Sequence, residues 1–126
     1  MLKLLAIAVG GAAGSILRYF ASTFTHRFVE PTFPWGTLAV NLFGCFLIGF
    51  LWPLFEKAAA TPEARALVFI GILGGFTTFS SFGLETFHLL RDGEYGRAAA
   101  NMLASNLAGI MLVFAGFFLA RQLFVK

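Results

Sequence analysis

The sequence has few charged residues: only 12% of its 126 residues are Asp, Glu, Lys or Arg, about half the roughly 25% typical of soluble domains. So few charges cannot coat a surface that faces water, which excludes a soluble globular domain. Hydrophobic residues make up 59% of the chain, so lipid is the expected solvent. Because a membrane-spanning helix takes about 20 apolar residues, the chain has room for about four spans and no separate soluble domain.

Cysteine is also scarce, since Cys45 is the single one and lies within an apolar stretch, which excludes an intrachain disulfide. The histidines and carboxylates show no metal-ligand spacing, and no nucleophile has a base nearby in the sequence. We therefore expect no enzyme. The net charge of +3 does not indicate a nucleic-acid partner, because the basic residues are scattered one or two per loop and form no stripe.

Hydropathy, with charged residues as boundaries, predicts an all-α membrane protein with both termini on one side of the membrane. The predicted single domain covers residues 1–126, with four spans near 2–24, 35–54, 66–90 and 98–120. Trp35 and Trp52 bracket the second span about 26 Å apart at helical rise, as interfacial anchors do.

The third span has an unusual centre, the sequence GGFTT at residues 74–78. Two glycines and two β-branched threonines make a poor helix interior, so we predict that this helix is broken there. Such a break is tolerated in hydrocarbon only where it is buried in protein or faces a cavity. Freed carbonyls suit a cation and the next helix N-terminus suits an anion, which makes the break a candidate ion site. The alternative is an unbroken helix whose glycines only pack.

Two phenylalanines follow the break. Phe79 and Phe82 are three residues apart and share a helical face, with Ser80 and Ser81 beside them. The edge of an aromatic ring is positive, so two rings can replace part of the water around a small anion without a charge that traps it. Among 17 phenylalanines, a packing or lipid-facing role is the alternative.

The polar groups inside the spans fall in one half of the membrane. At about 1.5 Å per residue, each lies within about 10 Å of its span centre and on the same side. Together with the two phenylalanine rings, the residues are Arg18, Asn41, Phe79, Phe82, Ser105 and Glu85. Because intramembrane polar groups tend to line pathways, we interpret this set of residues as the lining of one half of an ion pathway across the membrane. Two antiparallel copies would complete it, which predicts a homodimer.

The basic residues of the loops and termini set only a weak orientation. They divide five to three between the two sides, as Lys3, Lys57, Arg65, Arg121 and Lys126 against Arg27, Arg91 and Arg97. Since the bias of basic residues sets membrane orientation, this near balance permits insertion in both directions, that is, dual topology.

Several of these residues have alternative roles. Asn41 could form a helix-to-helix hydrogen bond, and Thr37 could bond its own backbone. Arg18 and Glu85 could both act in an aqueous vestibule. The alternatives are that Arg18 snorkels to the interface or forms an ion pair with Glu85. Three polar residues of the fourth span could bridge helices: Asn101, Ser105 and Asn106.

Three stretches together carry a family pattern: GGAAG before Arg18 at 10–14, GTLAVN at 36–41, and GILGGFTTFSSF at 71–82 followed by Glu85. They resemble the small bacterial fluoride channels, the Fluc or CrcB family, along essentially the whole chain, and the third stretch is the most specific. The resemblance implies a dual-topology homodimer of four-helix subunits with two antiparallel pores. It also implies passive export of toxic cytoplasmic fluoride, by a multi-pass protein of the bacterial cytoplasmic (inner) membrane.

Carried over residue by residue, the resemblance implies that Phe79 and Phe82 line the fluoride path and that Asn41 supplies an amide donor. Four hydroxyls are further candidates for the path: Thr37, Ser80, Ser81 and Ser105.

The resemblance also implies a cofactor, a structural sodium ion at the dimer centre, held by the backbone carbonyls of Gly74 and Thr77. The sequence departs from the family in the fourth span, where Asn101 stands in place of an aromatic hydroxyl.

Fluoride chemistry suits these residues. Fluoride is small and strongly hydrated, so a pore needs good donors, and a narrow dry constriction rejects the larger chloride. Conduction also needs binding weak enough for release, which favours neutral rings and amides. A rival reading, an exporter like the small multidrug resistance family, needs a carboxylate deep in the first span, where there is none, so Glu85 would have to substitute. A membrane enzyme lacks a catalytic grouping, and a purely structural subunit leaves the centred break unexplained.

Overall fold

Every regular element in the described part of the chain is a helix. The computed structural model describes residues 1–25, 27–29 and 32–125. Lys126, counted above among the basic residues, lies outside the described residues. The elements are α1 (Leu2–Thr25), α2 (Trp35–Lys57), α3 (Pro62–Arg65), the π-helix η1 (Ala66–Leu73), α4 (Gly74–Phe76), α5 (Phe79–Arg91), α6 (Tyr95–Leu103), the π-helix η2 (Ala104–Ala108) and α7 (Gly109–Phe124).

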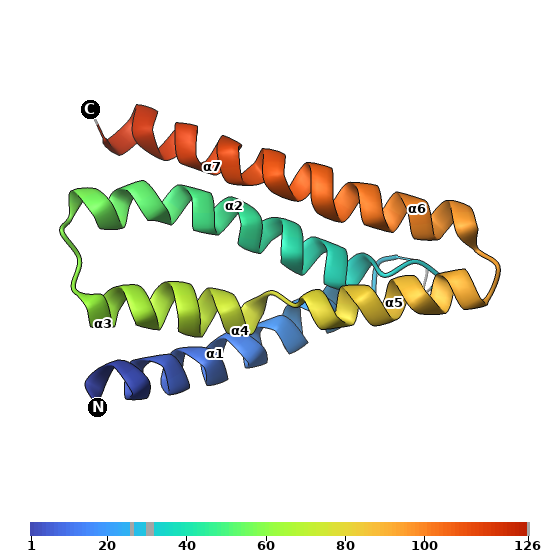
Figure 1. The fold of residues 1–126 in the computed structure, drawn as a ribbon, viewed down its shortest axis with the longest axis horizontal. Helices are drawn as coiled ribbons and strands as arrows, with labels where there is room; N and C mark the ends of the chain where they lie inside the picture. The colour runs from blue at the N-terminus through green and yellow to red at the C-terminus, as the bar shows by residue number, and fades with distance from the viewer. Residues whose placement is uncertain (26, 30–31, 126) are drawn as a thin grey trace.

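These elements make four spans that are long and apolar enough to cross a membrane, at Leu2–Thr25, Trp35–Lys57, Pro62–Arg91 and Tyr95–Phe124. The ends of α1 and α7 that carry the chain termini lie at the same end of the molecule as the α2–α3 turn (Figure 1). Large apolar side chains cover the outside, many of them more than half exposed. The chain is therefore a multi-pass membrane protein.

The helices run further than the charge boundaries predicted. At the start of the third span, the reason is that polar residues cap the helix and bond the turn before it. The third span begins at Pro62, four residues before the predicted start, since Thr61 Oγ1 accepts the amide of Ala64 at 3.2 Å as an N-cap. Arg65 donates to the carbonyls of Ala60 and Phe55 at 3.2 and 3.1 Å. Its charge is thereby used to fix the α2–α3 turn.

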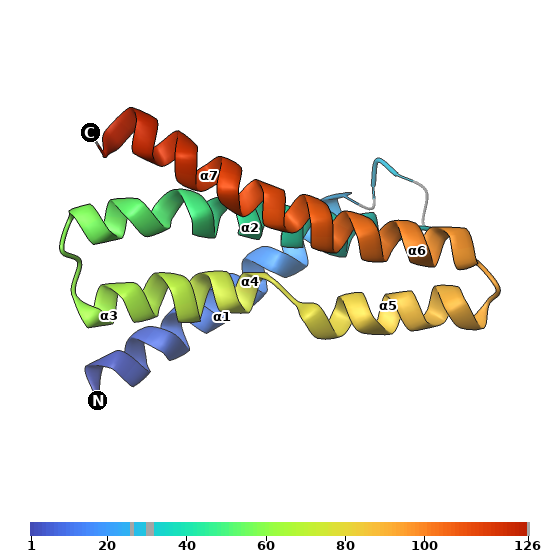
Figure 2. The same ribbon diagram turned by 45° about the horizontal axis from the view of Figure 1, so that its top comes forward.

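Glycines bring the spans into backbone contact. A Cβ built on Gly10 would stand 2.5 Å from the carbonyl oxygen of Leu67, and one on Gly75 would stand 2.6 Å from that of Gly11. These glycines lie where α1 packs against η1 and α4, and α1 crosses the third span obliquely (Figure 2). A second contact of this kind, at Gly49, joins α2 to α7. Close approach of this kind substitutes for the hydrophobic effect, which is missing between helices in lipid.

Candidate ion pathway at the centre of the third span

The helical backbone of the third span is interrupted at two residues. Thr77 has φ −82° and ψ 157°, and Thr78 has φ −151° and ψ 117°, so both are extended between α4 and α5. The thin link between these helices is visible in Figure 2. Within the sequence GGFTT, the stretch Gly74–Phe76 is helical, so only Thr77 and Thr78 depart from helical geometry.

Asn41 of α2 bonds the backbone at this interruption from both sides. Its Oδ1 accepts the Thr78 amide at 2.8 Å, and its Nδ2 donates to the Thr78 carbonyl at 3.0 Å. Because a backbone group without a partner in the membrane costs several kcal/mol, this side chain makes the extended segment tolerable. Asn41 thus forms the hydrogen bond between helices that was its alternative role. The bond to the Thr78 carbonyl uses one of the two hydrogens on Nδ2.

Thr78 also caps the helix that follows. Its Oγ1 accepts the amide of Ser81 at 3.2 Å, lies 3.1 Å from Ser81 Oγ and lies 3.2 Å from Ser80 Oγ. A threonine N-cap ends the extended segment and begins α5 at Phe79. The predicted serine pair is therefore gathered around one hydroxyl at the start of α5.

Two carbonyls at the interruption lose the partners that an α-helix would supply. The amide four residues after Gly74 is that of Thr78, which donates to Asn41. The amide four residues after Thr77 is that of Ser81, which donates to Thr78 Oγ1. The carbonyls of Gly74 and Thr77 are thus oxygen donors of the type that hard cations bind, and they fit the sodium ligand set that the resemblance implies.

The two phenylalanine rings lie together but in different surroundings. The ring centroids of Phe79 and Phe82 are 5.3 Å apart and the rings are tilted by 47°. Phe82 is only 8% exposed, whereas Phe79 is 79% exposed on the surface of the single subunit. One ring is held by the subunit itself, and the other is presented outward.

A cavity of about 310 Å³ brings most of the predicted ion-path residues together. The predicted residues among those that line it are Asn41, Gly74, Thr77, Phe79, Phe82 and Ser105. Ser105, in η2, has a buried Oγ without a hydrogen-bond partner among the described residues. The described side chains around this cavity carry no formal charge. Rings, an amide and an unengaged hydroxyl can solvate an anion without binding it tightly.

A second cavity, of about 490 Å³, gathers the predicted vestibule charges. Arg18, Thr37, Ser81 and Glu85 all line it, together with the capping residue Thr78. Thr37 Oγ1 donates to Glu85 Oε1 at 2.6 Å. Thr37 therefore bonds across to α5, and the alternative that it bonds its own backbone is wrong. Thr78 lines both cavities, so both lie next to the capped interruption.

The C-terminal end of α5 is polar and coincides with the end of the third span, which Asp92 directly follows. Arg91 Nε donates to Asp92 Oδ1 at 2.8 Å, in a pair whose side chains are more than half exposed. The hydrogen bond from Arg91 lowers the pKa of the Asp92 carboxyl below its ordinary value of 3.8. This pair marks one aqueous end of the third span.

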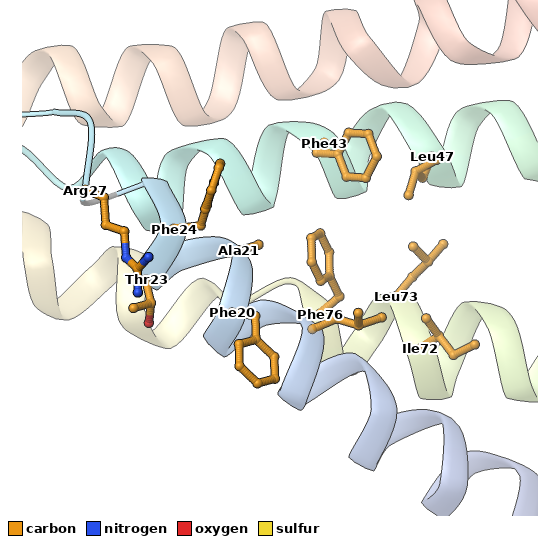
Figure 3. A pocket seen from close by; sticks show the side chains of 11 residues that line it. Phe20, Ala21, Thr23, Phe24, Arg27, Phe43, Leu47, Ile72, Leu73 and Phe76 are labelled. Carbon is orange, nitrogen blue, oxygen red and sulfur yellow. The ribbon is translucent and has the colours of Figure 1, made fainter.

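An apolar groove of about 730 Å³ runs between α1, α2 and the third span (Figure 3). Phe43 of α2 and Phe76 of α4 face each other across it, with ring centroids 6.2 Å apart. Arg27, beyond the end of α1, lies at one end of the groove. Aromatic and aliphatic side chains make up most of its lining, and Phe76 brings it next to the interruption.

One polar residue near the rings was missed at the sequence level. Thr86 donates to the Phe82 carbonyl at 2.8 Å and accepts from Asn101 Nδ2 at 3.0 Å. A signal was available, since Thr86 lies four residues after Phe82, on the same helical face.

The whole chain has close relatives. A model of the family described as CrcB-like protein, Camphor Resistance (CrcB), matches residues 5–117. A protein of Parabacteroides distasonis named fluoride-specific ion channel FluC is 46% identical over 123 residues, which cover 98% of this chain and 96% of the relative. Proteins of the same name from Salinibacter ruber and Aquifex aeolicus are 48% and 46% identical, over 92% and 94% of this chain and 87% and 96% of their own lengths. With its four spans and an uncharged cavity at the interruption of the third, this chain belongs to the CrcB family.

Proposed function

We propose that this chain is a fluoride channel, and not an enzyme, that exports cytoplasmic fluoride passively and so lowers fluoride toxicity. The relatives that match nearly its whole length are named fluoride-specific ion channels. The observation in the structure that carries the proposal is the uncharged cavity lined by Asn41, Phe79, Phe82 and Ser105. It offers neutral donors and ring edges at the interruption of a span.

The path runs through both cavities. A fluoride ion enters from the cavity lined by Arg18, Thr37 and Glu85, where charged side chains are available, and passes the capped start of α5. There it exchanges water for the positive ring edges of Phe79 and Phe82 and for donors such as the Ser105 hydroxyl. Ser80 and Ser81 contribute hydroxyls at the turn between the two cavities.

The channel is an antiparallel, dual-topology homodimer with two pores. Phe79 is 79% exposed in the single subunit, although the proposal places its ring in the path. A second copy would cover it and would also fill the apolar groove of Figure 3. The interruption of the third span, which lies at the membrane centre in each copy, would then stand next to the same interruption in the second copy.

A structural sodium ion sits at the centre of that dimer. The carbonyls of Gly74 and Thr77 would hold it, because the amides that would otherwise bond them are engaged by Asn41 and Thr78. The ion would supply fixed positive charge that stabilises the freed carbonyls. On this proposal sodium is structural: its removal loosens the dimer, whereas replacement of external sodium leaves fluoride flux intact. A sodium gradient that drives uphill fluoride transport would instead show coupled transport.

The test of the function is fluoride efflux from loaded liposomes, followed with an ion-selective electrode. The purified protein should release fluoride and retain chloride. Phe79→Ile and Phe82→Ile keep apolar bulk but remove the ring edges, so flux should fall strongly while the dimer persists in detergent. Phe114→Ile, an exposed ring on α7, is the matched control and should conduct normally. Equal release of both halides, or normal flux in both ring variants, would refute the proposal.

A further inference from the structure

A buried chain of hydrogen bonds ties α6 to the backbone of a proposed pore residue. Asn101 of α6 donates through Nδ2 to Thr86 Oγ1 of α5 at 3.0 Å, and this hydroxyl donates to the carbonyl of Phe82 at 2.8 Å. All three residues are buried, with exposed fractions of 1%, 6% and 8% for Asn101, Thr86 and Phe82. The hydroxyl of Thr86 is used as both donor and acceptor.

This chain of bonds acts on a half-helix that the interruption has detached. Because Thr77 and Thr78 are extended, α5 is not braced by continuous helical bonds from α4. Its N-terminus is tied to α2 through Asn41 and Thr78. Its buried residues are Phe82, Thr86 and Leu89, and Thr86 accepts the bond from Asn101 of α6. The bond from Asn101 is a buried side-chain contact that joins α5 to α6, in addition to the backbone bond from Glu94 to Leu89 at the turn between them.

Asn101 is placed to position the ring and not to meet the ion. It is not among the residues that line the cavity with Asn41, Phe79 and Phe82, and its Nδ2 is directed to Thr86. Its own helix continues directly into η2, where Ser105 follows four residues later and lines that cavity. A fixed Asn101 thus holds both a ring and a hydroxyl of the cavity at a set distance from each other.

We propose that Thr86 and Asn101 are positioning residues of the channel: they hold α5 in the register that presents the Phe82 ring to the ion. The inference rests on the proposed role of Phe82 in the fluoride path. It assigns to Asn101 a task that the hydroxyl residues of the cavity do not perform, which is to fix the wall of the path.

The first test removes the hydrogen bonds without changing shape. Thr86→Val deletes the hydroxyl, and Asn101→Leu deletes the donor while leaving the Thr86–Phe82 bond in place. We expect each to lower fluoride flux in liposomes by about 3- to 30-fold, the equilibrium shift that an interhelical hydrogen bond in a membrane supports. Thr86→Ser keeps the hydroxyl and should conduct near the wild-type rate. The double variant should be no slower than the slower single one, because the two residues act as one unit.

A matched control separates this role from general loss of a threonine. Thr25 donates its Oγ1 to the carbonyl of Ala21 at 2.8 Å, the same bond within one helix, without a bond to a second helix among the described residues. Thr25→Val should leave flux unchanged. Normal flux in Thr86→Val, or a loss in Thr86→Ser equal to that in Thr86→Val, would overturn the inference.

A spectroscopic readout distinguishes failure of the inference from failure of the pore proposal. 4-Fluorophenylalanine placed at position 82 alone gives one fluorine resonance that reports the surroundings of the ring. Thr86→Val and Asn101→Leu should shift or broaden it, whereas Thr25→Val should not. If Phe82→Ile lowers flux and the resonance does not respond, positioning is wrong and the pore role stands. If the resonance responds and Phe82→Ile conducts normally, the pore role is wrong.

Discussion

Asn41 offers the sharpest test of how the interruption is stabilised, because one side chain bonds both backbone groups of Thr78. Asn41→Leu removes both bonds at nearly constant size. Interhelical hydrogen bonds in membranes are worth about 0.6–2 kcal/mol each, so the two together should lower the free energy of unfolding by about 1–4 kcal/mol. Fluoride flux should fall much further, since the same change removes a donor from the cavity and frees the N-cap of α5.

A second variant separates the two losses. Asn41→Asp keeps an oxygen that can accept the Thr78 amide but loses the donor and adds negative charge beside an anion path. It should retain more stability than Asn41→Leu and still fail to conduct fluoride. Stability is measured by thermal unfolding followed by tryptophan fluorescence, and flux with a fluoride electrode in liposomes. An Asn41→Leu protein that unfolds and conducts like the wild type would refute the reasoning.

Two further predictions concern packing and orientation. Gly75→Ala should lower the thermal unfolding temperature and the yield of folded protein, because the new Cβ would stand 2.6 Å from the Gly11 carbonyl oxygen. The control, Gly83→Ala, places its Cβ with nothing within 4 Å and should be neutral. Equal effects of the two substitutions would show that the contact with α1 is loose. The second variant is Asp92→Cys at the exposed end of α5, made in a Cys45→Ala background. An impermeant maleimide should label about half of the protein in intact cells and nearly all of it after permeabilisation, because the weak charge bias permits both orientations. Labelling that is all or none in intact cells would establish a single orientation.

Much of the fold follows from local rules. Hydropathy and charge located the four spans, because in lipid a helix must satisfy its own backbone. The helix ends were less accessible: capping by Thr61 and the bonds of Arg65 to the α2–α3 turn depend on contacts between neighbouring segments. The π-helices η1 and η2 were not foreseen. Apolar periodicity does not report which backbone carbonyl an amide will choose.

The candidate site was predictable in its residues and less so in its bonds. Depth arithmetic grouped six residues: Asn41, Phe79, Phe82 and Ser105 line one cavity, whereas Arg18 and Glu85 line the other. It could not show that Asn41 bonds Thr78 or that Thr37 bonds Glu85, because depth along the membrane normal says nothing about rotation of a helix about its axis. The bond from Asn101 to Thr86 likewise depends on the rotation of two helices, although the spacing of Thr86 and Phe82 on one helical face was visible in the sequence.

The two halves of the third span are held by different kinds of contact, and this difference bears on how the protein can evolve. The half formed by η1 and α4 is fixed by glycines pressed against carbonyls of α1, where almost any larger residue collides. The half formed by α5 is held by side chains that can be exchanged one at a time, through Thr37, Asn41 and Asn101. Sequence libraries that seek an altered anion preference should therefore vary the contacts of α5 and leave the glycine side untouched.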